Sequence, residues 1–277
     1  MKKNTMTLMA AGTCAMIAAS AANAEVYYST NFGTGYTTGA LVPGAIQPDS
    51  AGQNGWKQTG NNPSTPIQVT NGAAIIGTSG QDVYHAFNPT VYPTAGNTLY
   101  YSASMKVTAA QSTGDYFLFV GDPVGTTTNF FGRLFAKSTS GGFLLGIQST
   151  SGTNSAVTYG ITTLSLNQTY NVVVAYDFAT GAFNDTFAVY VDPNSTNRAS
   201  LTSYVSAGWL STTQAEPSQL TEISLRQGSQ SNAPTVSVYS LSAGSSLADV
   251  GVIPVPAPGA AALVGLAGIL AGRRRRN

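Results

Sequence analysis

The 277-residue chain is poor in cysteine, histidine and charge. Its only cysteine is Cys14, its only histidine is His85, and 8% of its residues are charged. Without a second cysteine the fold cannot depend on disulfides, and a zinc site would lack its usual ligands. A histidine-based catalytic triad would depend wholly on His85. We therefore expect His85 to be a packed or surface residue of a strand.

Basic residues are scarce outside the two ends of the chain. Six of the twelve Lys and Arg residues are Lys2, Lys3 and 273–276, which leaves six basic residues against eleven acidic ones in the body. The body thus carries a net charge near −5. A nucleic-acid partner is disfavoured because it requires a basic surface. Little charge with abundant Gly, Ser, Thr and Asn is typical of a secreted β-protein.

The first 24 residues have the three-part pattern of a secretory signal peptide. Two lysines precede an apolar run from Leu8 to about Ala19, and the small-residue exit Ala22-Asn23-Ala24 follows. The run is shorter than the ~20 residues that a spanning helix needs. We therefore expect cleavage after Ala24. Cleavage would remove Cys14 and leave a mature chain without cysteine.

The C-terminus combines a proline motif, an apolar run and a basic end. Pro256, Ala257 and Pro258 precede the 14-residue apolar stretch 259–272. At about 1.5 Å per residue this stretch reaches roughly 21 Å, which is marginal against a hydrocarbon layer of about 30 Å. The basic residues that follow are Arg273, Arg274, Arg275 and Arg276. Because cytoplasmic flanks are enriched in such residues, the pattern predicts a transient inner-membrane intermediate.

This three-part arrangement resembles the PEP-CTERM sorting signal of exported proteins from bacteria that make exopolysaccharide, in a variant that reads VPAPG. Ala257 stands where the namesake glutamate of the signal would lie. The resemblance covers about residues 254–277. It implies processing near Pro256-Ala257-Pro258 by an exosortase-like membrane enzyme, at the surface of a Gram-negative-type bacterium. A plain C-terminal anchor helix is the alternative.

Residues 25–253 are predicted to form one all-β domain. Short runs rich in β-branched and aromatic residues are separated by turn residues, and no window outside the terminal signals has a convincing helical period. The predicted strands are 98–107, 115–120, 142–148, 169–178, 186–192, 221–226 and 235–242. Short strands without helical crossovers predict an antiparallel β-sandwich of two sheets.

The clearest hairpin joins TYNVVVAYDF (169–178) to TFAVYVD (186–192) through ATGAFND. Alternate residues of a strand point to the same face. The residues expected to face the core are Tyr170, Val172, Val174, Tyr176, Phe187, Val189 and Val191.

The stretch from Asn54 to Val250 resembles the concanavalin A-like lectin/glucanase sandwich in its laminin G-like form. The pieces that carry the resemblance are NGW (54–56), YFLFVGD (116–122), GGFLLGIQ (141–148), TYNVVVAYDFATGAFNDTFAVYVDP (169–193) and the closing segment 223–250. The resemblance implies a jelly roll of two curved sheets, whose concave face often binds glycans in relatives. Other relatives have no known ligand, and a fold alone does not specify a function.

Paired glutamates are also missing, which disfavours glycoside hydrolysis. A retaining glycosidase needs two carboxyl groups about 5 to 5.5 Å apart. Glu25, Glu216 and Glu222 have no acidic neighbour two or four positions away. Asp177 and Asp185 remain as a pair across the hairpin, although both stand at expected turn positions, where Asp bonds to the backbone. We predict no catalytic residue, and a hydrolase or lyase with an Asp-based site is the alternative.

Ligand and metal candidates are few. Trp56 and Trp209 are the only tryptophans and the candidates for stacking on a sugar, although burial in the core is the favoured interpretation of Trp56 and an equal alternative for Trp209. Calcium is compatible with this composition because it needs only carboxylate and carbonyl oxygens. Its candidate ligands are Asp115, Asp122 and Asp185, and no other cofactor is predicted.

The sequence thus predicts an exported, surface-directed, non-catalytic β-sandwich that binds glycans, mediates adhesion or forms part of an extracellular matrix. The expected partners are an exosortase-like enzyme and an exopolysaccharide or other glycan. A glycosidase or lyase and a purely structural surface protein are the alternatives.

Overall fold

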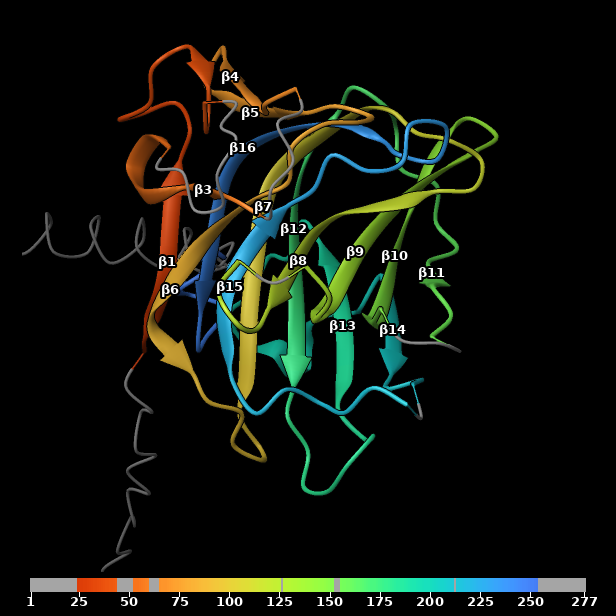
Figure 1. Ribbon diagram of the computed structural model, residues 1–277. Helices are drawn as coiled ribbons and strands as arrows, with labels where there is room; N and C mark the ends of the chain where they lie inside the picture. Colours follow the sequence, from red (N-terminus) through yellow and green to blue (C-terminus); the bar gives the residue numbers. More distant parts are fainter. Residues whose placement is uncertain are drawn as a thin grey trace, which may run out of the picture.

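A computed structural model of the chain describes residues 24–43, 52–59, 65–125, 127–151, 155–211 and 213–253. These residues form two antiparallel β-sheets packed face to face (Figure 1). The helices among them are two short 3-10 turns, η1 (Gln53–Gly55) and η2 (Arg198–Ser200). The predicted all-β sandwich is confirmed.

One sheet has nine strands, and its order is β14-β13-β12-β7-β16-β5-β4-β2, with β1 also pairing with β16. Its strands are β1 (Val26–Asn31), β2 (Gly39–Ala40), β4 (Gln68–Thr70), β5 (Ala73–Ile76), β7 (Thr98–Ala109), β12 (Thr169–Asp177), β13 (Thr186–Val191), β14 (Val205–Gly208) and β16 (Thr235–Gly244).

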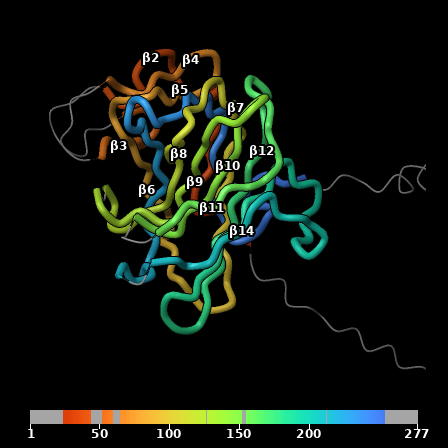
Figure 2. Tube along the Cα trace, turned by 90° about the vertical axis from the view of Figure 1, so that its right-hand side faces the viewer, coloured from red at the N-terminus to blue at the C-terminus, as the bar shows by residue number. Residues whose placement is uncertain are grey.

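The other sheet has seven strands in the order β11-β10-β9-β8-β15-β6-β3. Its strands are β3 (Lys57–Gln58), β6 (Val83–Val91), β8 (Asp115–Gly121), β9 (Phe130–Thr139), β10 (Gly142–Thr150), β11 (Thr158–Tyr159) and β15 (Leu220–Leu225). Figure 2 shows the two layers from the side, with β8 and β9 on one side of the sandwich and β7 and β12 on the other.

The central core lies between the sheets and contains the predicted hairpin face. β12 and β13 pair antiparallel, with Val174 opposite Val189. Six of the seven residues predicted to face inward belong to this core, and Val191 packs against its edge. Burying one such aliphatic side chain stabilises the fold by about 1.5 to 3 kcal/mol. The alternation in the two strands therefore fixed both their pairing and their inner face.

All seven predicted strands are present, with ends that differ by at most two residues. The sequence analysis did not predict β9, because Gly132 interrupts its strand pattern. Gly132 has a φ of 54°, and its carbonyl accepts a hydrogen bond from the hydroxyl of Tyr101 on β7. A Cβ at this position would lie 2.5 Å from that hydroxyl oxygen. A side chain cannot fit there, so glycine is required at this point in the strand.

The outer face of the nine-stranded sheet is covered by residues 245–252, which we call the C-terminal strap. Leu247, Val250 and Val252 pack in a cluster with residues such as Val173 and Tyr190 on the sheet. Ser102 Oγ also donates to the carbonyl of Val250 over 2.9 Å. The folded domain therefore extends to Val252, just before the predicted sorting signal.

The terminal signals fall outside this description. Residues 1–23 and 254–277, and with them Pro256, Ala257, Pro258 and Arg273–Arg276, lie outside the described residues, whereas Ala24 is described and exposed. In the part of the chain that is described, no helix has the length and hydrophobicity to cross a membrane.

Candidate functional site

The outer face of the seven-stranded sheet carries an unusual set of side chains. Tyr116, Phe119 and Phe135 form a buried aromatic cluster that is separate from the central core. Their strand neighbours Phe117, Leu134 and Ala136 belong to that core. Tyr116 and Phe119 reach the same face although they are three positions apart, because the register of β8 shifts between them. The partly buried residues packed against the cluster are Phe130, Val157 and Tyr159. We call this surface, with the polar residues described next, the outer aromatic face.

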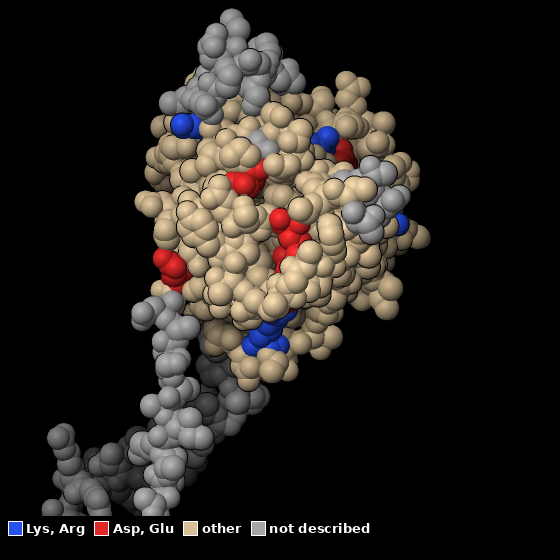
Figure 3. All heavy atoms as spheres, turned by 60° about the horizontal axis from the view of Figure 1, so that its bottom comes forward, with Lys and Arg blue, Asp and Glu red and all other residues tan. Residues whose placement is uncertain are grey.

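Three basic side chains lie against these rings. The guanidinium carbons of Arg226 and Arg133 lie 4.1 Å and 4.5 Å from the centroid of the Tyr116 ring. Lys137 Nζ lies 4.0 Å from the centroid of Tyr159. Each contact is attractive because the ring face carries negative charge. The body of the chain has only six basic residues, and elsewhere its charged side chains are scattered, as on the face seen in Figure 3.

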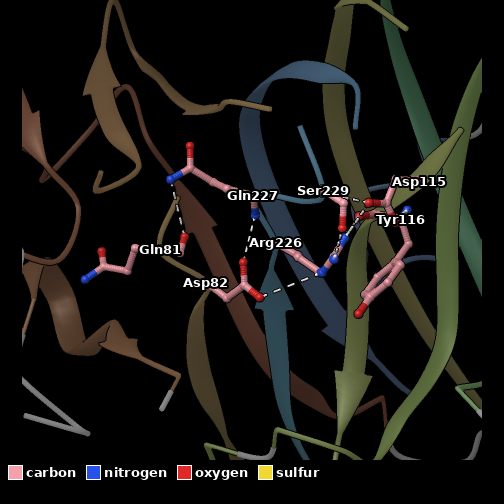
Figure 4. A network of polar contacts seen from close by, with 7 residues as sticks. All are labelled: Gln81, Asp82, Asp115, Tyr116, Arg226, Gln227 and Ser229. Atoms are coloured by element: carbon pink, nitrogen blue, oxygen red, sulfur yellow. Dashed lines mark hydrogen bonds and ion pairs between the residues drawn. The ribbon is translucent and has the colours of Figure 1, made fainter. Parts of the chain in front are cut away.

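Arg226 is held in a network of carboxylates and backbone groups (Figure 4). Its Nη1 lies 2.8 Å from Asp115 Oδ2, and its Nε lies 3.8 Å from Asp82 Oδ2. Backbone N–H groups of Ser229 and Gln227 donate to Asp115 and Asp82 over 3.0 Å and 2.9 Å. The loop after β15 is thereby tied to β8 and to the start of β6.

Arg133 has different surroundings. It lies opposite Gln148 in the β9–β10 register and donates through Nη2 to Gln148 Oε1 and, over 2.9 Å, to the carbonyl of Thr150. It is 9% exposed, and its buried Nε has no hydrogen-bond partner. Arg133 forms no ion pair with a carboxylate of the described residues.

Several ionisable groups on this face titrate away from their usual values. Burial raises the pKa of Asp82 to about 7, and Arg226 offsets this only in part. Burial lowers the pKa of Arg133 and raises that of Tyr116. Perturbed groups of this kind gather at functional sites more often than elsewhere. The outer aromatic face is therefore the strongest candidate site on the described part of the molecule.

Glu222 is the one glutamate near this face. It is buried, accepts a hydrogen bond from Ser224 Oγ over 3.0 Å, and is also bonded by the N–H of Gly125. The alternative catalytic pair lies elsewhere: Asp177 forms an ion pair with Arg198, and Asp185 accepts the N–H of Ala179 over 2.8 Å. Both aspartates are thus engaged in holding the hairpin and its loop.

The two tryptophans lie inside the protein. Trp56 is 0% exposed, and Trp209 is 7% exposed with its ring stacked 6.0 Å from Phe131 and 6.4 Å from Phe187. Neither ring offers a free face to a sugar. Trp56 lies in the core, as its favoured interpretation has it, and both tryptophans are corrected as candidates for stacking on a ligand. The physical reason is that an indole buries more apolar area than almost any other side chain in a sandwich core.

Trp56 nevertheless supports a surface hollow. Its Nε1 donates over 3.0 Å to the hydroxyl of Tyr36. Tyr36 lines a pocket of about 440 Å³ together with Asn54 and His85, which the sequence did not single out as a group. His85 lies in β6, as predicted, and both ring nitrogens face backbone carbonyls, those of Ala86 and Asn54.

The three aspartates proposed as calcium ligands are not brought together. Asp115 and Asp122 lie at opposite ends of β8, where Asp115 binds Arg226 and Asp122 accepts from Gln219 over 2.9 Å. Asp185 belongs to the hairpin loop. Within the described ranges, no three His, Cys, Asp or Glu side chains are grouped as metal ligands. These residues do not fit a shared calcium site, which needs six to eight converging oxygens.

Comparisons with known proteins give the fold context. No family model and no curated protein matches this chain. The CBM2 module of the evolved Dit of Lactobacillus casei BL23 phage J-1 is 13% identical, with a TM-score of 0.44 over 80% of this chain and 96% of that one.

Two further solved structures are similar to a comparable degree. Endo-β-1,4-glucuronan lyase from the fungus Trichoderma reesei is 13% identical, with a TM-score of 0.39 over 80% of this chain and 92% of that one. The exoplasmic/lumenal domain of VIP36 in its Ca²⁺/Man3GlcNAc-bound form is 12% identical, with a TM-score of 0.42 over 70% and 87%. The similar structures thus include both binding domains and a lyase, and their similarity assigns neither role to this chain.

Proposed function

We propose that the chain is an exported, non-catalytic glycan-binding protein whose ligand site is the outer aromatic face. The observation that carries this proposal is the placement of three of the six basic residues of the body against aromatic rings on one sheet face. Sugar sites combine apolar ring contacts with a few directed polar groups. Phe130 and Tyr159 supply partly exposed rings, and the guanidinium of Arg133, oriented by Gln148, supplies a polar group.

The proposal is tested by a glycan array with residues 25–253 and by titration of the glycans that bind. Tyr159→Ala should weaken binding at least about fivefold, because an aromatic contact contributes about 1 kcal/mol or more. Tyr92→Ala is the matched control, since Tyr92 is 66% exposed and lies outside the outer aromatic face. An array without any bound glycan would support a purely structural surface protein instead.

A glycosidase or lyase is the second candidate, and Asp82 favours it. A carboxyl group with a pKa of about 7 can exchange a proton at neutral pH. It shares Arg226 with Asp115, which places two carboxylates at one cation. Steady release of reducing ends or of unsaturated sugars from a polysaccharide, abolished in Asp82→Asn, would establish this candidate. We expect no turnover, because Arg226 and backbone N–H groups already bond both carboxylates.

The route to the surface is part of the proposal. We propose cleavage after Ala24, a pause in the inner membrane at 259–272, and processing near Pro256-Ala257-Pro258 by an exosortase-like enzyme. Moving each of the four arginines to the bilayer centre costs on the order of 2.5 to 3.5 kcal/mol. Replacing Arg273–Arg276 with serine should therefore reduce processing. The test is the mass of the protein recovered from the cell surface: a mass that retains the apolar stretch and the arginines identifies an ordinary anchor.

A further inference from the structure

Two arginines lie against one tyrosine ring, and only one of them has a counter-ion. Arg226 is paired with Asp115 and Asp82. Arg133 lies 4.5 Å from the same Tyr116 ring, yet it has no ion pair with the described residues. Arg226 is thus a buried cation with a neutralising carboxylate, and Arg133 is a buried cation without one.

The carboxylates of Asp115 and Glu222 are already held by other partners. Asp115 Oδ1 accepts the N–H of Tyr116 over 2.8 Å, and its Oδ2 accepts from Ser229 and Arg226. Both oxygens of Glu222 are likewise bonded, by Ser224 and Gly125. Rearranging either carboxylate toward Arg133 would break bonds that already satisfy it.

The surroundings of Arg133 are costly for an isolated cation. The side chain is 9% exposed, and its Nε is buried without an acceptor. Its remaining contacts are uncharged, namely the Gln148 amide, the Thr150 carbonyl and two ring faces. A buried donor without a partner is destabilising, and more so when it is charged. A ligand oxyanion that approaches this guanidinium would supply the missing charge.

We propose that Arg133 anchors the carboxylate or sulfate of an acidic glycan on the outer aromatic face. The inference rests on the proposed glycan-binding function and adds the charge of the ligand. A guanidinium donates to an oxyanion along fixed directions in its plane, which a flexible ammonium cannot reproduce. Because Nη2 already donates to Gln148 and Thr150, the oxyanion would bind at Nη1. Lys137, two positions past Phe135 on the same strand, places a second cation at Tyr159. These local cations are needed because the body, with a net charge near −5, otherwise repels acidic sugars.

The test uses residues 25–253 and three sets of oligosaccharides with one common backbone, which are neutral, carboxylated at C6 or sulfated at C6. Titration calorimetry should give an affinity at least about tenfold higher for an acidic set than for the neutral set. The carboxylated and sulfated sets identify which oxyanion is preferred. Arg133→Gln should remove the preference. Lys106→Gln, which removes one positive charge from the other sheet, should retain it.

The outcomes separate the two proposals. Equal affinity for neutral and acidic sets, or a preference that survives in Arg133→Gln, overturns the role of Arg133 and leaves glycan binding standing. Absence of binding to every set and to the array overturns both proposals. If Arg133→Gln does not fold, Arg133→Lys and the salt dependence decide. A Kd for the acidic set with no more dependence on salt, from about 50 mM to about 500 mM, than the Kd for the neutral set contradicts the anchor, because only a charge contact adds to the salt dependence.

Discussion

The guanidinium of Arg226 stacks on the ring of Tyr116 at 4.1 Å and bonds Asp115, the residue that precedes this tyrosine, at 2.8 Å. One side chain from the loop after β15 therefore holds both the ring and the first carboxylate of β8. This arrangement fixes Tyr116 between two arginines, of which Arg133 is the one without a carboxylate partner among the described residues.

Asp115→Ala should destabilise the domain strongly. The substitution removes the bonds to Arg226, Ser229 and the N–H of Tyr116 together. Removing one partner of a mostly buried ion pair costs about 3 to 5 kcal/mol. Urea unfolding followed by tryptophan fluorescence gives the change. A loss below about 1 kcal/mol would show that Asp82 alone suffices to hold Arg226.

Asp82→Asn should change how stability depends on pH. Burial raises the pKa of Asp82 to about 7 in the folded state, above the value of about 3.9 in an unfolded chain. The stability that this shift provides is complete below about pH 4 and is lost as the pH rises through 7. The asparagine of this variant cannot ionise, so the variant does not lose this stability. Between about pH 4 and about pH 7 the stability of Asp82→Asn relative to the native protein should therefore rise, on the order of 1 to 2 kcal/mol after allowance for solvent screening.

Asp177→Asn provides the opposite control. Burial raises the pKa of Asp177, but hydrogen bonds from Arg198 and Thr98 outweigh it and lower the pKa overall. Its contribution to stability is present above the unfolded pKa and is lost as the pH falls. Asp177→Asn should therefore lose stability against the native protein as the pH rises. Parallel pH profiles for the two variants would contradict the assigned surroundings of Asp82.

Val174→Asp should prevent cooperative folding. Val174 is 1% exposed and lies between Tyr101 and Val189 in the nine-stranded sheet. An unpaired carboxylate there costs several kcal/mol, a large part of the stability of a domain. Thr169→Asp, at an exposed position of the same strand, is the control and should fold normally. The readouts are circular dichroism and thermal unfolding, and a stable Val174→Asp variant would mean that the inner face is assigned wrongly.

Leu247→Ala should reveal the C-terminal strap as part of the fold. Leu247 is 3% exposed against the outer face of the nine-stranded sheet, so truncation should cost about 2 to 4 kcal/mol. Ile253→Ala is the control, because Ile253 is 80% exposed and should change stability by less than about 0.5 kcal/mol. Equal melting temperatures for both variants would mean that the strap does not hold the sheet face.

The strands and the core could be predicted because local pattern and burial agree in them. In β12 and β13 every second residue is apolar and lies on the inner face, so the hairpin could be predicted from the sequence. β9 could not be predicted, because Gly132 interrupts its run of apolar residues. Position 132 requires glycine because of Tyr101, about thirty positions earlier in the chain. A constraint that comes from a distant residue leaves no local pattern.

The candidate site was harder to predict from the sequence than the fold. Arg133 and Lys137 are four positions apart and so share a strand face, which was an available signal in FFGRLFAKS. The meeting of Arg133 with Tyr116 and Arg226 depends on the strand order β9-β8-β15, which joins segments about ninety residues apart. The tryptophans could not be assigned firmly, because aromatic identity alone does not distinguish a ring that stacks on a ligand from one that fills the core.

Amide hydrogen exchange with and without a bound glycan tests the central claim most directly. The account predicts slower exchange on binding in β8, β9 and β10 and in the loop after β15, with the nine-stranded sheet and the C-terminal strap unchanged. Protection confined to the nine-stranded sheet, or to the pocket lined by Tyr36 and Asn54, would contradict the outer aromatic face as the ligand site.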